Sequence, residues 1–249
     1  MKVIVGTTAT EYTDQGRGPT LLLLHGWKDD LKTFDKLLKE LSSSYRIVRL
    51  DMPGFGGTDI PKGTWRVSDY AQFVRRFLEK VHIEPDVIVG HSFGGRVIIR
   101  GVGTGELQPK KIVLIAAAGL ARKRTWRNRL LSVVAKIGKM VTSIPPLSSR
   151  KQELRRTLYE AIGSDYFAAG ALKDTFVAVV SEDLSRYAAR IKIPTLLIWG
   201  SEDASTTLDQ GKRIASLIQG SRLEVINGAS HFVHVEQPGK VAEFISSFV

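Results

Sequence analysis

The sequence contains no cysteine and no apolar run near the 18 residues that suggest a membrane span. Disulfide bonds, thiolate nucleophiles and cysteine-based zinc sites are therefore excluded, and we expect neither a metal nor a cofactor. The first eight residues include only three consecutive apolar ones, which is too few for the apolar core of a signal peptide. From these features we expect a cytoplasmic protein.

Acidic residues are nearly absent from one segment. Residues 119–156 contain eleven Lys and Arg but a single acid, Glu153, so they hold +10 of the chain's net charge of +11. We interpret the segment as the solvated face of a helix, although basic residues 122–156 could also attract an anionic substrate or a membrane surface. Nucleic-acid binding is not expected, because no second motif supports it.

Apolar runs alternate with amphipathic segments along most of the chain. Runs without polar alternation favour strands buried on both faces of a parallel sheet. The expected strands are 3–5, 10–13, 20–24, 46–50, 86–89, 111–115, 195–199 and 222–226. The expected helices are 33–41, 68–81 with Ser68 as N-cap, 206–219 and 238–248. This order predicts an α/β fold, with a mostly parallel sheet of the eight-stranded type between two layers of helices.

The alternation of strands and helices stops after residue 118. Residues 119–185 have helical patterning and few strand signals, so we expect a helical cap inserted over the carboxyl edge of the sheet. Residues 1–118 and 186–249 would then form the core of one domain.

A Gly-x-Ser-x-Gly turn, Gly90–Gly94, joins an apolar run to a helix-compatible run. A strand, a sharp turn and a helix form the context of a nucleophile elbow, which exposes a serine Oγ at the edge of a sheet. The pattern is also typical of a plain glycine-rich connection. Ser92 is therefore a candidate nucleophile only if the chain supplies a base and an acid.

Histidine is the usual base for a serine hydroxyl, because its pKa is near neutrality. His231 follows the last expected strand and so ends at the same sheet edge as Ser92. His234 is an alternative candidate for the base, although a role in packing or in capping the terminal helix would also explain a histidine at this position. Asp203 follows the preceding strand and is expected to orient the imidazole, with the adjacent Glu202 as the alternative.

Two backbone N–H groups are expected to form an oxyanion hole. The N–H of Phe93 follows the nucleophile, and the N–H of Trp27 lies in the loop after strand 20–24. Candidate side chains for the substrate pocket, with core packing as the alternative, are Trp126, Phe167, Phe176 and Tyr187.

Five motifs recur at the expected strand ends. They are His25-Gly26-Trp27, Asp51-x-Pro-Gly-x-Gly, Gly90-His91-Ser92-Phe93-Gly94-Gly95, Gly200-x-x-Asp203 and Gly228-x-x-His231. With these motifs and the order Ser, Asp, His, the chain resembles the α/β-hydrolase-fold superfamily, in particular its cap-bearing serine hydrolases. The resemblance implies that His25 and Asp51 shape loops and are not catalytic. The sequence departs from relatives at Lys28-Asp29-Asp30, where they often have small residues, and after Asp203, where they often have a proline.

A serine nucleophile predicts acyl transfer to water. The expected reaction is cleavage of a small-molecule carboxylic ester or related acyl substrate through an acyl-enzyme, as in carboxylesterases. Carbon–carbon bond hydrolysis and peracid formation use the same triad in some relatives and stay open, as does a ligand-binding protein without catalysis. The sequence sets neither the acyl group nor the oligomeric state.

Overall fold

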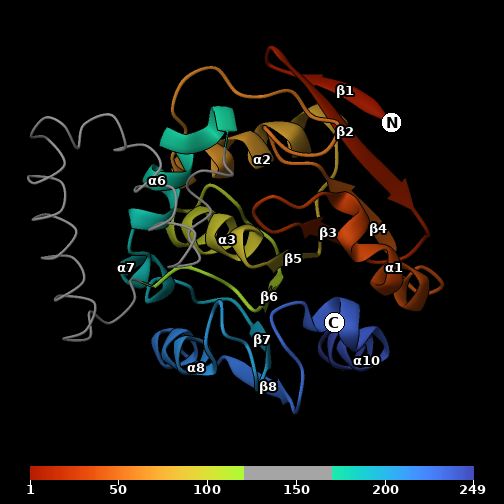
Figure 1. The fold of residues 1–249 in the computed structure, drawn as a ribbon. Coiled ribbons are helices and arrows are strands. Elements are labelled where there is room, and N and C mark those ends of the chain that lie inside the picture. The colour runs from red at the N-terminus through yellow and green to blue at the C-terminus, as the bar shows by residue number, and fades with distance from the viewer. Residues whose placement is uncertain (121–169) are drawn as a thin grey trace, which may run out of the picture.

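A computed structural model of the chain describes residues 1–120 and 170–249, and in these ranges eight strands form one sheet (Figure 1). The strands are β1 (Lys2–Val5), β2 (Thr8–Gln15), β3 (Thr20–Leu24), β4 (Arg46–Leu50), β5 (Val87–His91), β6 (Lys111–Ile115), β7 (Thr195–Gly200) and β8 (Arg222–Ile226). Their order is β1-β2-β4-β3-β5-β6-β7-β8. The pairs β1–β2 and β2–β4 are antiparallel and the other five pairs are parallel, so the mostly parallel sheet is confirmed.

Both faces of the sheet are covered, which explains the continuous apolar runs. In β3, Leu22 and Leu24 belong to one apolar cluster, while Leu21 and Leu23 belong to the other. The first cluster includes residues of α2 (Val67–Val81), α3 (Phe93–Thr104), α7 (Ser185–Ala188) and α8 (Leu208–Leu217). The second includes residues of α1 (Asp35–Leu41), α9 (Val233–Glu236) and α10 (Pro238–Phe248). Figure 1 shows the two layers on opposite sides of the strands.

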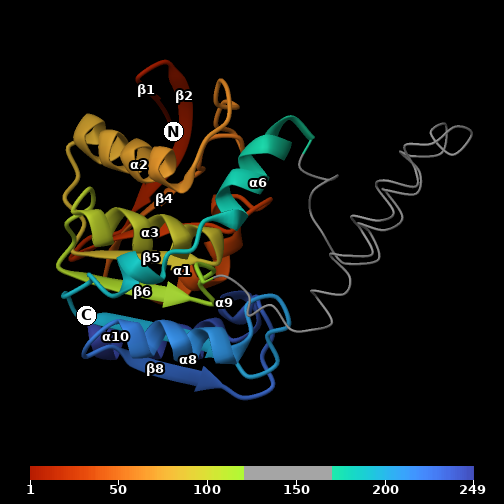
Figure 2. The same cartoon turned by 90° about the vertical axis from the view of Figure 1, so that its left-hand side faces the viewer.

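A helical segment lies at the carboxyl edge of the sheet. It consists of η3 (Gly170–Leu172) and α6 (Lys173–Ser181), and Figure 2 shows the arrowheads of β6 and β8 pointing toward its side of the molecule. The Trp65 N–H, just before α2, donates to Thr175 Oγ1 at 3.0 Å. Helix α6 lies within residues 119–185, the segment expected to form a cap. The extent of that cap stays a prediction.

Several predicted features lie outside the described residues. These are Trp126, Phe167 and the basic residues 122–156. In the described ranges, no helix combines the length and the apolar character needed to cross a membrane.

Candidate active site

Ser92 occupies a strained turn between β5 and α3. Its backbone has φ 49° and ψ −104°, a conformation that is costly for a residue with a side chain. The turn is held from both sides, because the Ser92 N–H donates to the Ile115 carbonyl at 3.0 Å and the Ser92 carbonyl accepts from the Ala118 N–H at 3.0 Å. The surrounding structure therefore fixes the serine in the geometry of an elbow.

Glycines around Ser92 are required by close approaches. A Cβ at Gly94 would lie 2.1 Å from the Leu24 carbonyl oxygen, and one at Gly95 would lie 2.4 Å from the Ala117 Cβ. A Cβ at Gly90 would lie 2.6 Å from the carbonyl carbon of Gly94. The helix α3 can thus begin directly against the strand ends, which is the packing that a sharp strand-to-helix turn needs.

Asp203 and His231 form a hydrogen-bonded pair from two neighbouring loops. His231 Nδ1 lies 2.9 Å from Asp203 Oδ2, and the aspartate side chain is fully shielded from solvent. Burial of Asp203 raises its pKa, but hydrogen bonds from His231 and Thr206 and the charge of His231 lower the pKa overall. The carboxylate therefore stays ionised and fixes the proton of His231 on Nδ1, which leaves Nε2 as an acceptor.

Thr206 also contacts this pair, although no motif in the sequence marks it as a site residue. Its Oγ1 lies 2.8 Å from Asp203 Oδ2, to which it can donate its proton, 2.9 Å from the Ala116 carbonyl oxygen and 3.2 Å from His231 Nδ1. Asp203 Oδ1 in turn accepts from the backbone N–H groups of Thr206 and Ser205, both at 2.8 Å. The only sequence signal was the missing proline in this loop.

Glu202 and His234, the alternatives to Asp203 and His231, have different surroundings from those residues. Glu202 is exposed, whereas Asp203 is buried against His231. His234 is fully buried, and its Nε2 lies 3.1 Å from Thr33 Oγ1, with no hydrogen bond to a carboxylate in the described ranges. Its surroundings fit the packing role that the sequence left open.

Three imidazole rings lie together, and one of them belongs to His91, directly before the serine. His91 lies between the other two, with ring centroids 4.8 Å from His231 and 4.4 Å from His234. His91 Nε2 lies 3.1 Å from the carbonyl oxygen of His231, so its N–H supports the loop that holds this residue. Burial lowers the pKa of His91 well below its ordinary value, and His234 and His231 lower it further. No group of acidic or histidine side chains in residues 1–120 or 170–249 could hold a metal ion.

The two expected oxyanion donors lie on adjoining loops. A Cβ at Gly26, directly before Trp27, would lie 3.7 Å from the Ser92 Cβ, and the Gly94 N–H donates to the His25 carbonyl at 3.0 Å. The backbone N–H groups of Trp27 and Phe93 have no acceptor among the described residues. The expectation that both would donate to an oxyanion stays a prediction.

The loops that carry these donors are shaped by His25 and Asp51, as the resemblance implies. The fully buried His25 donates from Nδ1 to the Gly26 carbonyl at 2.7 Å and accepts the Met52 N–H on Nε2 at 3.0 Å. Asp51 accepts backbone N–H groups from Leu31 at 2.7 Å and from Gly57 at 2.8 Å. Their side chains are thus occupied by backbone groups.

Aromatic side chains surround the indole of Trp27. Its ring centroid lies 4.9 Å from that of Phe55, 5.2 Å from Phe93 and 5.3 Å from Phe176. Phe176 on α6 therefore lies beside the candidate site. Tyr187, in contrast, packs against α3, where a Cβ at Gly103 would meet its backbone and side chain.

The sheet order, the two helical layers and the serine elbow together define an α/β-hydrolase fold. A family model described as "Alpha/beta hydrolase family" matches residues 21–244. The chain therefore belongs to the alpha/beta hydrolase family.

Known relatives resemble the chain over its whole length. It is 26% identical over 260 residues to the pyrrolizixenacetamide deacetylase of Xenorhabdus hominickii, covering 100% of this chain and 97% of that protein. It is 26% identical over 259 residues to a monoacylglycerol lipase of Homo sapiens, covering 94% of this chain and 76% of that protein. A crystal structure of a bacterial membrane phospholipase A matches with a TM-score of 0.78 at 24% identity, covering 100% and 84% of the two chains, which supports the fold.

Proposed function

We propose that the protein is a serine hydrolase that cleaves a small carboxylic ester or related acyl substrate through a covalent acyl-enzyme. The observation that carries this proposal is the Asp203–His231 hydrogen bond of 2.9 Å in loops that leave the same sheet edge as the serine elbow. The names of two relatives, a deacetylase and a lipase, agree with hydrolysis at an acyl group.

The proposed first step transfers the substrate's acyl group to Ser92. His231 Nε2 accepts the Ser92 hydroxyl proton while Oγ attacks the carbonyl carbon, and the protonated ring then gives that proton to the leaving alcohol. Asp203 stabilises the imidazolium through Nδ1. Ser92 Oγ has no hydrogen-bond partner among the described residues, and catalytic hydrogen bonds of this kind commonly tighten when substrate binds.

The backbone N–H groups of Trp27 and Phe93 would stabilise the tetrahedral intermediate. Negative charge develops on the former carbonyl oxygen, and unpaired donors held by a rigid fold stabilise it without reorganisation. Water then attacks the acyl-enzyme, with His231 again as base, and releases the carboxylic acid.

We further propose that residues 119–185 form a cap over this site. The support is the placement of α6, whose Phe176 meets the indole of Trp27 at 5.3 Å. Such a cap would separate the site from bulk solvent, while still admitting the attacking water, and would limit the size of the acyl group.

A panel of esters that differ in acyl-chain length tests the proposed function. We expect saturable hydrolysis of one or more esters, and Ser92→Ala should lower kcat by roughly a thousandfold or more. Peracid formation and cleavage of a carbon–carbon bond, measured in parallel, test the alternatives with the same triad. Retained ester hydrolysis in Ser92→Ala would show that another group is the nucleophile.

A further inference from the structure

The side chain of His91 is a buried polar group that the proposed reaction does not use. It belongs to the last residue of β5, directly before Ser92, and 1% of its surface is exposed. Burial removes water from both ring nitrogens, and such a loss is normally offset by contacts within the protein. The contacts of His91 join it to the loop of the proposed base and to the loop that follows β3.

The first contact is with the backbone of His231. His91 Nε2 lies 3.1 Å from the His231 carbonyl oxygen, and a carbonyl oxygen can only accept. The His91 proton therefore lies on Nε2. The ring also packs against the imidazole of His231, with centroids 4.8 Å apart and an interplanar angle of 51°. His91 thus contacts both the backbone and the side chain of the same residue.

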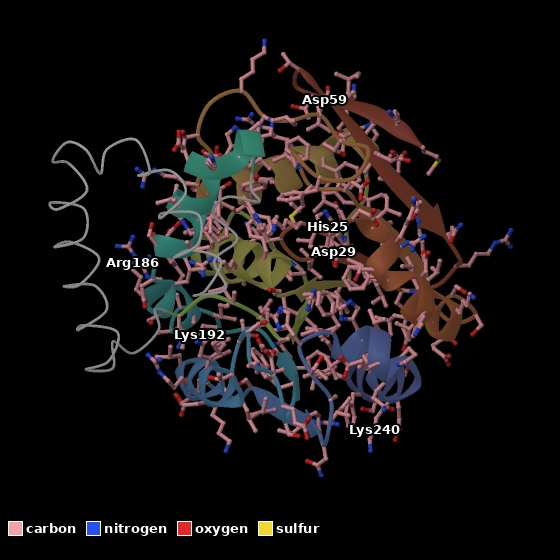
Figure 3. The ribbon with its side chains drawn as sticks, in the orientation of Figure 1. His25, Asp29, Asp59, Arg186, Lys192 and Lys240 are labelled. Atoms are coloured by element: carbon pink, nitrogen blue, oxygen red, sulfur yellow. The ribbon has the colours of Figure 1, made fainter. Side chains whose placement is uncertain are left out.

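The second contact is with the loop after β3. His91 Nδ1 has no hydrogen-bond partner in the described ranges, and a Cβ at Gly26 would lie 3.0 Å from it. The same Cβ would lie 3.7 Å from the Ser92 Cβ, so the glycine leaves room for both side chains. His25, the preceding residue, lies near the centre of the molecule, whereas Lys240 lies at its periphery (Figure 3). His91 Nδ1 therefore rests against the backbone of an interior loop.

A third ring, that of His234, packs against His91 with centroids 4.4 Å apart. Its Nε2 lies 3.1 Å from Thr33 Oγ1 and its Nδ1 has no partner within residues 1–120 and 170–249, so in these ranges it does not hydrogen-bond the His231 loop. Burial, reinforced by His234 and His231, lowers the pKa of His91 well below its ordinary value. The His91 ring is therefore neutral and has one proton, the one directed at His231.

We propose that His91 is a positioning residue of the proposed hydrolase. Its Nε2–H holds the carbonyl of His231 while its ring holds the imidazole, so that His231 Nδ1 stays within hydrogen-bond distance of Asp203. The inference rests on the proposed function and adds a residue that acts through the base. A displacement of a catalytic group by about 1 Å can lower a rate by about a hundredfold, so a fixed orientation of His231 matters for turnover.

The neutral state of His91 suits the same step. When His231 accepts the serine proton, the imidazolium forms with its ring centroid 4.8 Å from that of His91. A second charged ring at this distance would disfavour the imidazolium by like-charge repulsion. A neutral donor holds the carbonyl without that repulsion.

The tautomer of His91 in the unmodified protein is the first test. Two-bond proton–nitrogen NMR correlations on protein with isotope-labelled histidine distinguish a proton on Nε2 from one on Nδ1, and loss of signals in His91→Gln assigns them. We expect the Nε2–H form of His91 at neutral pH. The Nδ1–H form could not donate to the His231 carbonyl and would overturn the proposal.

Two variants of His91 test the consequence for the base. In His91→Gln an amide N–H can still donate to the carbonyl, whereas His91→Met has a similar length and no donor. On an ester that the protein hydrolyses, kcat in His91→Met should fall by roughly tenfold or more with KM changed by less than about twofold, and kcat in His91→Gln should stay within about threefold of the original value. His234→Met is the matched control in the neighbouring buried ring and should alter kcat by less than about threefold.

The pattern of losses decides between positioning and packing. An unchanged kcat in His91→Met would overturn the proposal. Equal losses in His91→Met and His91→Gln, or in His91→Met and His234→Met, would also overturn it, because packing of the rings would then explain the effect.

A measurement on His231 itself separates failure of this inference from failure of the proposed function. The His231 Nδ1 proton, shared with Asp203, exchanges with water at a rate that NMR magnetisation transfer measures. Release of the His231 carbonyl should accelerate this exchange by roughly tenfold in His91→Met and by less than about twofold in His91→Gln. That result would support the role of His91 even if no ester is hydrolysed. An unchanged exchange rate in His91→Met would overturn it, even if hydrolysis by Ser92 is established.

Discussion

Thr206 Oγ1 lies 2.8 Å from Asp203 Oδ2 and joins the carboxylate to the end of β6 through the Ala116 carbonyl. The hydroxyl contacts Asp203 Oδ2, while the backbone N–H groups of Ser205 and Thr206 donate to Oδ1, so both carboxylate oxygens are held in place. A threonine in this loop therefore acts through Asp203, as a positioning residue.

Replacing Thr206 by valine should weaken the pair without changing the shape of the loop. A hydrogen bond to a charged group contributes about 1.5–3 kcal/mol, so we expect kcat to fall by roughly tenfold or more. Because this hydrogen bond lowers the pKa of Asp203, the carboxyl should be protonated at a higher pH in Thr206→Val, which an NMR titration of the folded protein measures. The exposed Thr207→Val is the matched control, and a similar loss of kcat there would argue against a specific role for Thr206.

Asp203 and Glu202 are adjacent carboxylates with different surroundings. Asp203→Asn removes the charge that stabilises the imidazolium and disturbs the tautomer of His231, so kcat should fall by roughly a thousandfold or more. Glu202→Gln makes the same chemical change on an exposed side chain and should alter kcat by less than about twofold. Steady-state kinetics on one ester compare the two variants directly. Equal losses would mean that the acid has been assigned to the wrong residue.

Gly94 and Gly239 occupy equivalent second positions in α3 and α10 but differ in free space. A Cβ at Gly94 would lie 2.1 Å from the Leu24 carbonyl oxygen, whereas nothing lies within 4 Å of one at Gly239. Gly94→Ala should lower the free energy of unfolding by about 2 kcal/mol or more, because the clash is with backbone. Gly239→Ala should raise it by about 0.4–1 kcal/mol. Urea denaturation measures both, and a neutral Gly94→Ala would refute the close approach of α3 to β3.

The buried histidines make stability depend on pH. Burial lowers the pKa of His234 from 6.5 to about 3, with a smaller contribution from His231, and the ring also faces His91. Between these pH values the unfolded chain binds a proton that the folded chain does not. Stability is therefore full above about pH 6.5 and falls as the pH decreases.

His234→Gln isolates this contribution. One proton corresponds to about 1.4 kcal/mol per pH unit, so the free energy of unfolding should change less steeply by about that amount between pH 4.5 and 6. His91 and His25, whose pKa values are also lowered by burial, should maintain a residual slope of the same sign. The exposed His82→Gln is the control variant. An unchanged slope in His234→Gln would contradict the neutral, buried state of this ring.

The strands could be predicted from sequence because their burial on both faces leaves continuous apolar runs. Leu21 to Leu24 have at most 1% of their surface exposed, so no polar alternation interrupts the run. The first residues of the helices were predicted less accurately than the strands. The expected N-cap Ser68 was wrong, because α2 begins at the buried Val67 and the Asp69 carboxylate accepts the Arg66 N–H at 2.7 Å.

A candidate site residue could be predicted from sequence where a single motif marks it. Residues that join the site through contacts between distant segments could not be predicted in this way. Ser92 was identified from its own turn. Thr206 and His91 touch His231 only because separate loops meet at one edge, and neither residue type is distinctive at its position.

Covalent labelling of Ser92 tests the central claim most directly. The folded protein would be incubated with a fluorophosphonate, digested, and mapped by mass spectrometry. We predict one label, on Ser92, that forms rapidly in the native protein, slows by orders of magnitude in His231→Ala and is absent after unfolding in urea. No label on Ser92, or an equal rate of labelling in His231→Ala, would contradict a serine nucleophile activated by His231.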